Sequence, residues 1–276
     1  MGNWLKDKKY NKYLTIFKIS WQNTFVYRLS FLIWRLESVI LFFVTYLFWF
    51  SVYRFNQEVG NYNEQTMLTY IIGSAFLRAL VLQSKNADIS GEIGTGSISS
   101  AFLKPISYFG LWFSRDLSAK ALNLIFFVFE FGLIILFFQP TLFIQTNILN
   151  VLAFLLFSFL GLITYFYLSL LISLTTFWYP EHNGWPARFL FSVVIDYFLS
   201  GGLLPLDVLP KTIFSILKLL PSTYIRFFPI QIYLGRVENS DILLGFLVSL
   251  FWLFVLRYVV KIIWSKGIKR YDALGI

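Results

Sequence analysis

Residues 148–178 read ILNVLAFLLFSFLGLITYFYLSLLISLTTFW, and this stretch contains no Asp, Glu, Lys, Arg or His. A helix needs about 20 predominantly apolar residues to cross a hydrocarbon core of roughly 30 Å. The stretch exceeds that length, so its helix must tilt strongly or extend past the membrane surface. It therefore predicts a transmembrane helix.

Similar apolar stretches recur along the whole chain. Hydrophobic residues make up 58% of the 276 residues and charged residues only 13%, whereas soluble domains contain about 25% charged residues. The sequence therefore predicts an all-α membrane protein with a single transmembrane domain, residues 1–276. The expected spans are 31–53, 66–83, 117–138, 148–178, 187–206 and 242–264. The fifth should end near Gly201, Gly202 and Pro205, where a helix breaks.

Basic residues between the spans indicate the orientation of the chain. They concentrate in three segments, 1–30, 84–116 and 265–276. The loops near 54–65 and 139–147 have only Arg54 between them. Both termini are therefore expected in the cytosol, and the lysine-rich N-terminus shows no cleavable signal sequence. The loop at 205–241 departs from this trend because it contains four basic residues.

Two regions outside the spans are expected to form helices that do not cross the membrane. From Tyr10 to Arg28, aromatic and apolar residues recur at three- and four-residue spacings opposite lysines, which predicts an amphipathic helix in the headgroup region. The alternative is an ordinary helix packed on the rest of the protein. In the external loop, Thr212–Leu220 and Tyr224–Leu234 are apolar but too short to span, so we expect re-entrant or interfacial helices.

Composition excludes several kinds of site. The chain has no cysteine, which rules out disulfides and thiolate zinc sites. Its one histidine, His182, has only Glu181 beside it, too few ligands for a metal. We therefore predict no metal, cofactor or catalytic residue. The net charge of +9 is spread over the loops, which favours contact with anionic membrane lipids and not with nucleic acid.

The segment Lys85–Tyr108 reads KNADISGEIGTGSISSAFLKPISY and is the least apolar part of the chain. Gly91 and Gly96 have the spacing of a phosphate-binding loop, but Ser97 stands where that loop requires lysine. The segment instead predicts a short amphipathic element that ends before Pro105, built from Ile93, Ile98, Phe102 and Leu103. Such an element either docks into a groove on a soluble partner or tucks under its own bundle.

Two short motifs accompany this layout of spans: FLKPI at residues 102–106 and WSKGIKRYDALG at residues 264–275. In their order and in the hydropathy of nearly the whole chain, they resemble the ABC-2 type permeases, the membrane subunits of bacterial ABC exporters. The resemblance implies a permease in the bacterial cell membrane, without catalytic machinery, that pairs with an identical or different second permease. It also implies that a separate cytosolic ABC ATPase binds the ATP.

In that family layout, the first cytosolic loop is the coupling element that the ATPase grips, together with the N-terminal helix. The resemblance implies docking through the loop containing Glu92 to Phe102, without a role for each residue. The docking candidates are Glu92, Ile93, Ile98, Phe102 and Leu103. Closure of the ATPase pair would move this element, and rigid helices would carry the motion to the membrane pathway.

Two acidic residues fall deep inside predicted spans, where an ionised side chain is costly. They are Glu130 in the third span and Asp196 in the fifth. In contrast, Arg35, Glu37 and Arg78 lie nearer the cytosolic ends, where long side chains can reach the interface. Glu130 and Asp196 either serve substrate binding or helix pairing at a subunit interface, or are neutral hydrogen-bonded carboxyls, or mark a misjudged span boundary.

Three other functions compete with an exporter permease. An intramembrane transferase or protease needs a catalytic cluster of polar residues, and the spans show none. The coupling subunit of a vitamin importer has short Ala-Arg-Gly motifs, which are absent here. A secondary transporter often has internal repeats with paired broken helices, and the two halves of this chain do not match. The sequence leaves the transported substrate open.

Overall fold

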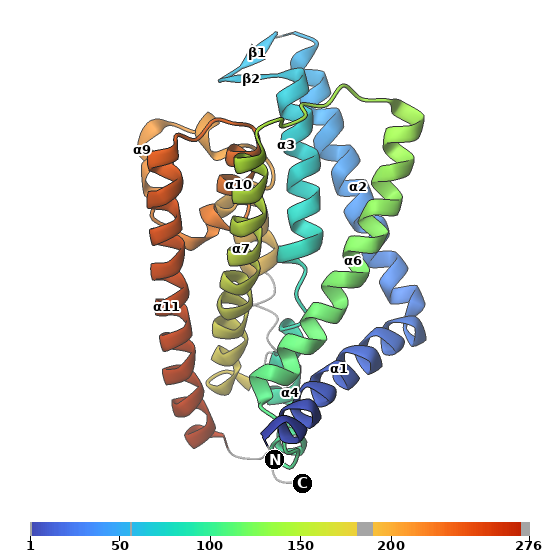
Figure 1. Cartoon of the computed structure of the whole chain (residues 1–276), viewed down its shortest axis with the longest axis vertical. Helices are drawn as coiled ribbons and strands as arrows, with labels where there is room; N and C mark the ends of the chain where they lie inside the picture. The colour runs from blue at the N-terminus through green and yellow to red at the C-terminus, as the bar shows by residue number, and fades with distance from the viewer. Residues whose placement is uncertain (1, 56, 181–189, 272–276) are drawn as a thin grey trace.

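The computed structural model describes residues 2–55, 57–180 and 190–271, which form an elongated bundle of helices (Figure 1). Within this part of the chain, the strands are β1 (Glu58–Val59) and β2 (Tyr62–Asn63), which pair antiparallel at one end of the bundle. The predicted all-α class is confirmed.

Five helical segments of the described chain are long and apolar enough to cross a membrane. They are α2 (Arg28–Tyr53), α3 (Glu64–Leu77) with its continuation to Gly94, α6 (Tyr108–Phe138), α7 (Ile148–Leu174) with its continuation to Phe177, and α11 (Asn239–Arg270). They match the first, second, third, fourth and sixth predicted spans. A sixth span exists in the described residues only if one sharply bent pair of short helices is counted as one. The chain is a multi-pass membrane protein.

The predicted span 187–206 has a different structure. Its start lies outside the described residues, and η4 (Leu190–Leu199) is a π-helix of 10 residues, which is too short to cross the bilayer. The chain then turns at Gly201, whose φ of +83° suits glycine. A Cβ on Gly202 would lie 2.3 Å from the Asp196 carbonyl oxygen. Within the described residues, the helix ends at Leu199, and the break expected near Gly201 and Gly202 is present. A complete span over 187–206 stays a prediction, because residues 187–189 lie outside the described residues.

The loop that follows contains the short helices expected there. Helices α9 (Lys211–Leu217) and α10 (Phe227–Tyr233) flank the 3-10 turn η6 (Pro221–Tyr224), and the chain bends by 83° between α9 and the segment that holds η6 and α10. At Gly161 of α7, the backbone of this loop approaches so closely that a Cβ would lie 3.2 Å from the Ile225 carbonyl oxygen. The loop therefore packs into the bundle and does not lie loosely over it.

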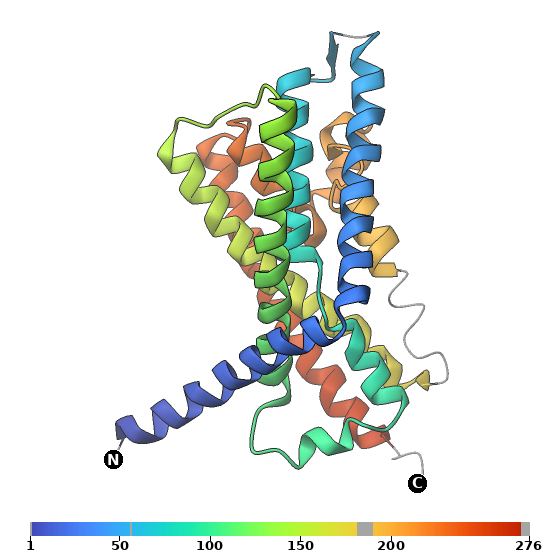
Figure 2. The same ribbon diagram turned by 90° about the vertical axis from the view of Figure 1, so that its right-hand side faces the viewer.

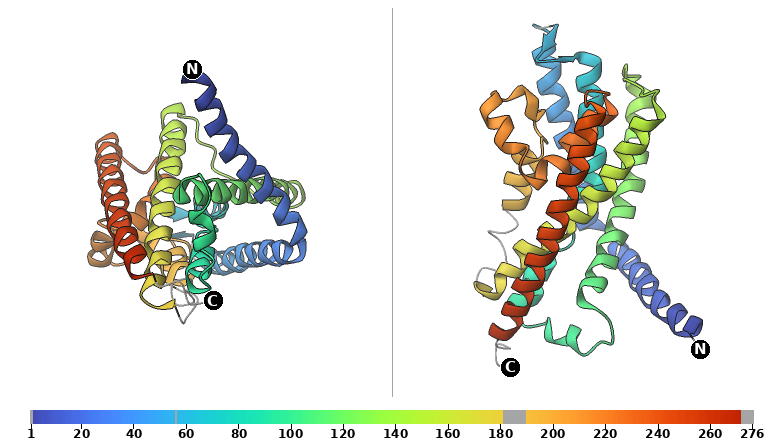
Figure 3. Two further views of the ribbon diagram at one scale, coloured as in Figure 1. Left: turned by 90° about the horizontal axis from the view of Figure 1, so that it is seen from below. Right: turned by 60° about the vertical axis from the view of Figure 1, so that its left-hand side comes forward.

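The two ends of the bundle contain different segments. Helices α4 (Ala87–Gly94) and α5 (Ser99–Phe102) lie at the end where the described chain begins and stops, which we call the basal end (Figures 1 and 2). The strands β1 and β2 and the connection at 139–147 lie at the opposite end (Figure 1). Helix α11 runs the length of the molecule between the two ends (Figure 3, right). The loop at 84–116, which was expected in the cytosol, therefore lies at one end of the bundle, and the loops at 54–65 and 139–147, which were expected outside, lie at the other end.

Helix α1 (Gly2–Val26) projects from the basal end at an angle to the bundle (Figure 2). It packs on α6, where the ring of Tyr13 lies so close to Gly110 that a Cβ there would come within 2.6 Å of it. Phe17 on the same face is half-buried, whereas Leu14 is exposed. The expected helix is present and one face packs on the bundle. Its position at the headgroups stays a prediction.

Candidate functional site

The predicted coupling segment forms α4 and α5, joined by a tight turn at the basal end. Gly96 adopts a φ of +76° in this turn, a conformation that side chains with a Cβ rarely adopt. The Ile98 N–H donates to the Glu92 carbonyl oxygen at 3.0 Å, and the Tyr271 hydroxyl after α11 donates to the Gly96 carbonyl oxygen at 2.8 Å. The turn is thus fixed both locally and by the far end of the chain.

Two of the five docking candidates face inward. Ile93 and Ile98 are 2% and 0% exposed. They belong to a cluster that we call the basal core, formed by Ile89, Ile93, Ile98, Tyr108, Leu111, Trp112, Phe166, Leu170, Leu174, Phe177 and Val260. The expectation that Ile93 and Ile98 touch a partner directly therefore needs correction: the turn at Gly96 folds the larger apolar face of the segment onto its own bundle.

Glu92 is also engaged within the chain. Its carboxylate accepts a hydrogen bond from the Tyr108 hydroxyl at 2.9 Å and one from Arg115 Nη1 at 3.0 Å. The Arg115 guanidinium in turn lies 4.7 Å from the centre of the Trp112 ring. Glu92 therefore fastens α4 to the start of α6, and this contact leaves its docking role a prediction.

Phe102 and Leu103 form the outward-facing part of the segment, which we call the apolar tip. Phe102 is 45% exposed and Leu103 is 88% exposed. The backbone cannot continue as a helix beyond them because Pro105 follows. Two neighbouring apolar side chains therefore lie at the surface of the basal end, supported from behind by the buried Ile98.

The end of α11 backs the apolar tip, a contact that the sequence did not suggest. Trp264 stacks on Tyr108 with 4.9 Å between ring centres and lies 6.1 Å from the Phe102 ring. Phe177 presses against Gly267, where a Cβ would come within 2.3 Å of its ring. Trp264 thus connects the end of α11 to Phe102 and Tyr108, a contact that we call the aromatic joint.

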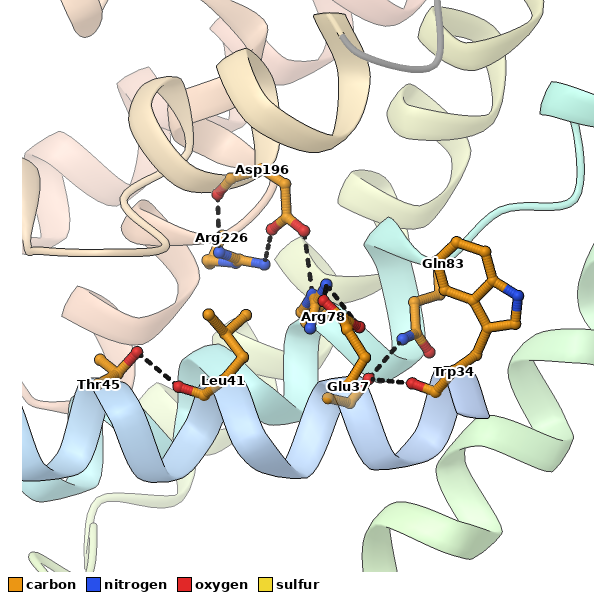
Figure 4. Close-up of polar contacts among 9 residues, drawn as sticks. Trp34, Glu37, Leu41, Thr45, Arg78, Gln83, Asp196 and Arg226 are labelled. Atoms are coloured by element: carbon orange, nitrogen blue, oxygen red, sulfur yellow. Dashed lines mark hydrogen bonds and ion pairs between the residues drawn. The ribbon is translucent and has the colours of Figure 1, made fainter. Parts of the chain in front are cut away.

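Buried charges form a second site, inside the membrane-spanning part (Figure 4). The Asp196 carboxylate accepts from Arg78 Nε at 3.0 Å through one oxygen and from Arg226 through the other. Arg226 Nη1 also donates to the Asp196 carbonyl oxygen at 2.9 Å. Asp196 therefore joins η4, the π-turn η1 (Arg78–Leu82) after α3, and the re-entrant loop.

The remaining charges near this network are also paired. Arg78 Nη2 donates to Glu37 on α2 at 3.0 Å. Arg35 donates through Nε to one carboxylate oxygen of Glu130 on α6 at 3.0 Å, and through Nη2 to the other oxygen of Glu130. Arg35, Glu37 and Arg78 were expected to reach toward the interface, but here they act as partners across helices. For Glu130 and Asp196, the contacts observed are helix pairing within one chain.

Another charge pair was missed in the sequence. Lys120 and Asp116 of α6 are fully buried and lie 3.4 Å apart. Lys120 Nζ donates to the carbonyl oxygens of Val81 at 2.6 Å and Gln83 at 3.2 Å, which the end of η1 leaves without helical partners. The i,i+4 spacing of opposite charges on an apolar helix was the available signal.

A cavity of about 50 Å³ lies between α2 and the buried charges. Its polar lining includes Arg35, Arg78, Arg226, Glu130, Ser74 and Tyr70. Its apolar lining extends along α2 to Trp49, about 21 Å from Arg35 at 1.5 Å per residue. The cavity is therefore lined by charged groups near Arg35 and by aromatic and aliphatic side chains toward Trp49.

The end opposite the basal end has a polar cap outside the spans. Tyr62 is fully buried, and its hydroxyl donates to Asp207 at 2.8 Å. The Arg236 guanidinium lies 3.8 Å from the centre of the Tyr62 ring. Burial raises the pKa of Tyr62, and burial also raises the pKa of Asp207 against the lowering effect of the Tyr62 hydrogen bond. The cap ties the β1–β2 hairpin to the re-entrant loop.

Within the ranges 2–55, 57–180 and 190–271, no three His, Cys, Asp or Glu side chains gather in a way that would hold a metal ion. Each acidic side chain of the buried network is instead joined to an arginine. His182 and Glu181 lie outside the described residues. The arrangement offers guanidinium donors and an apolar cavity.

Comparison with protein families agrees with this layout. A family model described as "ABC-2 family transporter protein" matches residues 39–275. That range contains the five long helices except for the start of α2, as well as the coupling segment and the re-entrant loop. No curated protein matches the chain. Because the match covers most of the sequence, the chain belongs to the ABC-2 family of transporter proteins and is a permease-type membrane component.

Proposed function

We propose that this protein is the transmembrane subunit of an ATP-binding cassette exporter, with all 276 residues acting as one permease domain. A separate cytosolic ATPase binds and hydrolyses the ATP, and a second permease subunit, identical or different, completes the pathway. The basal end, with both termini, faces the cytosol of a bacterial cell, and the chain lies in the cell membrane. Family membership supports this proposal.

The observation that carries the proposal is the apolar tip. Phe102 and Leu103 are exposed at the basal end, beyond a segment in which Ile89, Ile93 and Ile98 are buried. Exposed neighbouring apolar residues on a firmly held element mark an interaction surface when they lie outside the lipid. A groove on the ATPase would receive the tip, while Ile93, Ile98 and Glu92 hold it in position.

Two connections carry movement of the tip into the membrane part. Through Trp264, the tip contacts α11, which extends to the opposite end of the molecule. Through α4, it is linked to Ser84 and Lys85, both of which hydrogen-bond Asp116 of α6. ATP-driven movement of the docked element would therefore displace α11 and α6 together.

The test is co-purification with the ABC ATPase encoded beside this gene. Leu103→Asp places a charge in the proposed contact and should abolish the complex, because an unpaired charge in a desolvated interface costs several kcal/mol. Ile144→Asp is the matched control, since Ile144 is 76% exposed at the opposite end. The complex should survive that change.

Ile98→Asp separates docking from positioning. Because Ile98 is fully buried, its replacement should loosen the basal core and lower the melting temperature, whereas Leu103→Asp should leave stability unchanged. A complex that resists Leu103→Asp contradicts the assigned docking surface. Failure of the unmodified chain to bind any neighbouring ATPase contradicts the exporter assignment itself.

A further inference from the structure

The cavity beside α2 has more hydrogen-bond donors to offer than acceptors. We propose that it binds the oxyanion headgroup of an amphiphilic substrate, a phosphate or carboxylate, with the alkyl part along the apolar lining toward Trp49. That the bound amphiphile is a transported substrate rests on the proposed function. That the cavity binds it depends only on the residues that line the cavity.

The carboxylates of the network are already engaged. Both oxygens of Glu130 accept from Arg35, and both oxygens of Asp196 accept from arginines. Both oxygens of Glu37 accept from Arg78 Nη2, at 3.0 and 3.3 Å. A cationic headgroup would have to displace an arginine from one of these pairs, which leaves a buried charge uncompensated.

The arginines, in contrast, have capacity left. Arg78 Nη1 and Arg226 Nε are buried and have no hydrogen-bond partner among the described residues. Both arginines line the cavity. Buried N–H groups of a guanidinium without an acceptor are costly, and an oxyanion is the acceptor that matches their geometry. Gln83 Oε1 is an unpaired acceptor in the same lining, suited to a hydroxyl group or a protonated oxygen of the ligand.

Glu37 is the group that such a ligand would replace. Its side chain is 38% exposed, compared with 8% for Asp196 and 17% for Glu130. It is therefore the carboxylate that can most readily leave Arg78 and become hydrated. An incoming oxyanion that takes its place keeps the charge of the network unchanged, so binding requires no new buried charge.

The cavity has room for the headgroup, and the alkyl part would continue along its apolar lining. Its volume of about 50 Å³ has room for a few water molecules or one phosphate-sized group. Phe42, Ile71 and Phe131 form apolar walls beyond the arginines. Helix α2 bounds one side of the cavity and exposes apolar residues outward, so the proposed alkyl part would lie on the side of the cavity that is nearest to the lipid.

Binding can be measured on the purified chain without any ATPase, in dodecyl maltoside, by native mass spectrometry and calorimetry. The probes are dodecyl phosphate, dodecyltrimethylammonium and inorganic phosphate. Dodecyl phosphate should bind with one site per chain. The cationic amphiphile should not compete with it, and inorganic phosphate should compete poorly, because it lacks the chain that fills the apolar lining.

Glu37→Gln should increase the affinity for dodecyl phosphate, an effect that misfolding would not produce. Removing the internal competitor for Arg78 should tighten dodecyl phosphate binding by about tenfold, the scale of one hydrogen bond to a charged group. Arg78→Gln should weaken it by at least about tenfold for the same reason. Glu58→Gln, an exposed carboxylate at the opposite end, is the matched control and should change nothing.

Equal binding of the cationic probe, or no gain from Glu37→Gln, overturns the assignment of an oxyanion site. Inorganic phosphate that competes as well as dodecyl phosphate would show a site for free anions and would overturn the amphiphile part. Neither result touches the exporter assignment, which depends on complex formation at the basal end.

Discussion

The basal end exposes an apolar side chain, whereas the buried charge network buries a charged one. At the basal end, Leu103 is apolar and 88% exposed among the residues that the structure describes. In the network, Asp196 is charged and 6% exposed, and two arginines meet it. The apolar side chain at the basal end is available to another protein, whereas the buried carboxylate is already paired with arginines of the same chain.

The difference teaches where each region is rigid. A buried carboxylate shared by two arginines from separate segments fixes those segments relative to one another. The apolar tip is connected to the bundle through Trp264, the turn at Gly96 and the Glu92–Arg115 pair, and we expect it to move with these contacts as a unit. We therefore expect the network to determine stability and the basal end to determine coupling.

The largest effect should come from Asp196→Ala. It leaves Arg226, which is 2% exposed, and Arg78 without a shared counter-charge, and should lower the free energy of unfolding by about 3–5 kcal/mol. Thermal or denaturant unfolding in detergent measures this. Asp241→Ala, an exposed aspartate in the first turn of α11, is the control. If both variants lost the same free energy of unfolding, the buried network would not determine stability.

An intermediate effect is expected from Trp264→Ala. Loss of the stack on Tyr108 and of the contact with Phe102 should cost about 1–3 kcal/mol, because Trp264 is only half-buried. Hydrogen exchange should accelerate in α4 and α5 but not in α10. Trp252→Ala, in the first half of α11, should leave the exchange of the coupling segment unchanged.

The smallest effect should follow Glu92→Gln. The Glu92–Arg115 pair has side chains 25% and 32% exposed, so screening by water limits its contribution to below about 1 kcal/mol. The unfolding free energy should change little and depend on salt concentration. A loss comparable to that of Asp196→Ala would mean that the basal end is as firmly fixed as the network.

The sequence predicted what depends on local hydropathy. Five spans, the short helices after Pro210 and the turn before Pro105 follow from apolar runs and helix breakers. The inward direction of Ile98 could not be predicted, because a short amphipathic element shows which residues share a face but not what that face covers. Phe102 and Leu103 lie on the part left outside only because Gly96 reverses the chain.

The charge network escaped prediction for a different reason. Arg226 was counted as a loop charge, since the segment around it is too short to span. Its side chain meets Asp196 only because the loop bends back into the bundle and Gly202 leaves room for its guanidinium, which a Cβ would approach within 2.0 Å. Such a contact joins residues that no local pattern relates.

The π-turn at Arg78–Leu82 has one more consequence. Lys120 takes the place of water for the carbonyl groups at its end, so the backbone can abandon helical geometry within the bundle. As a result, Arg78, which holds Asp196, and Ala87, the first residue of α4, are nine positions apart along the chain. If the proposed ATPase displaces α4, the displacement would reach Arg78 along this short segment and would weaken its contact with the proposed headgroup.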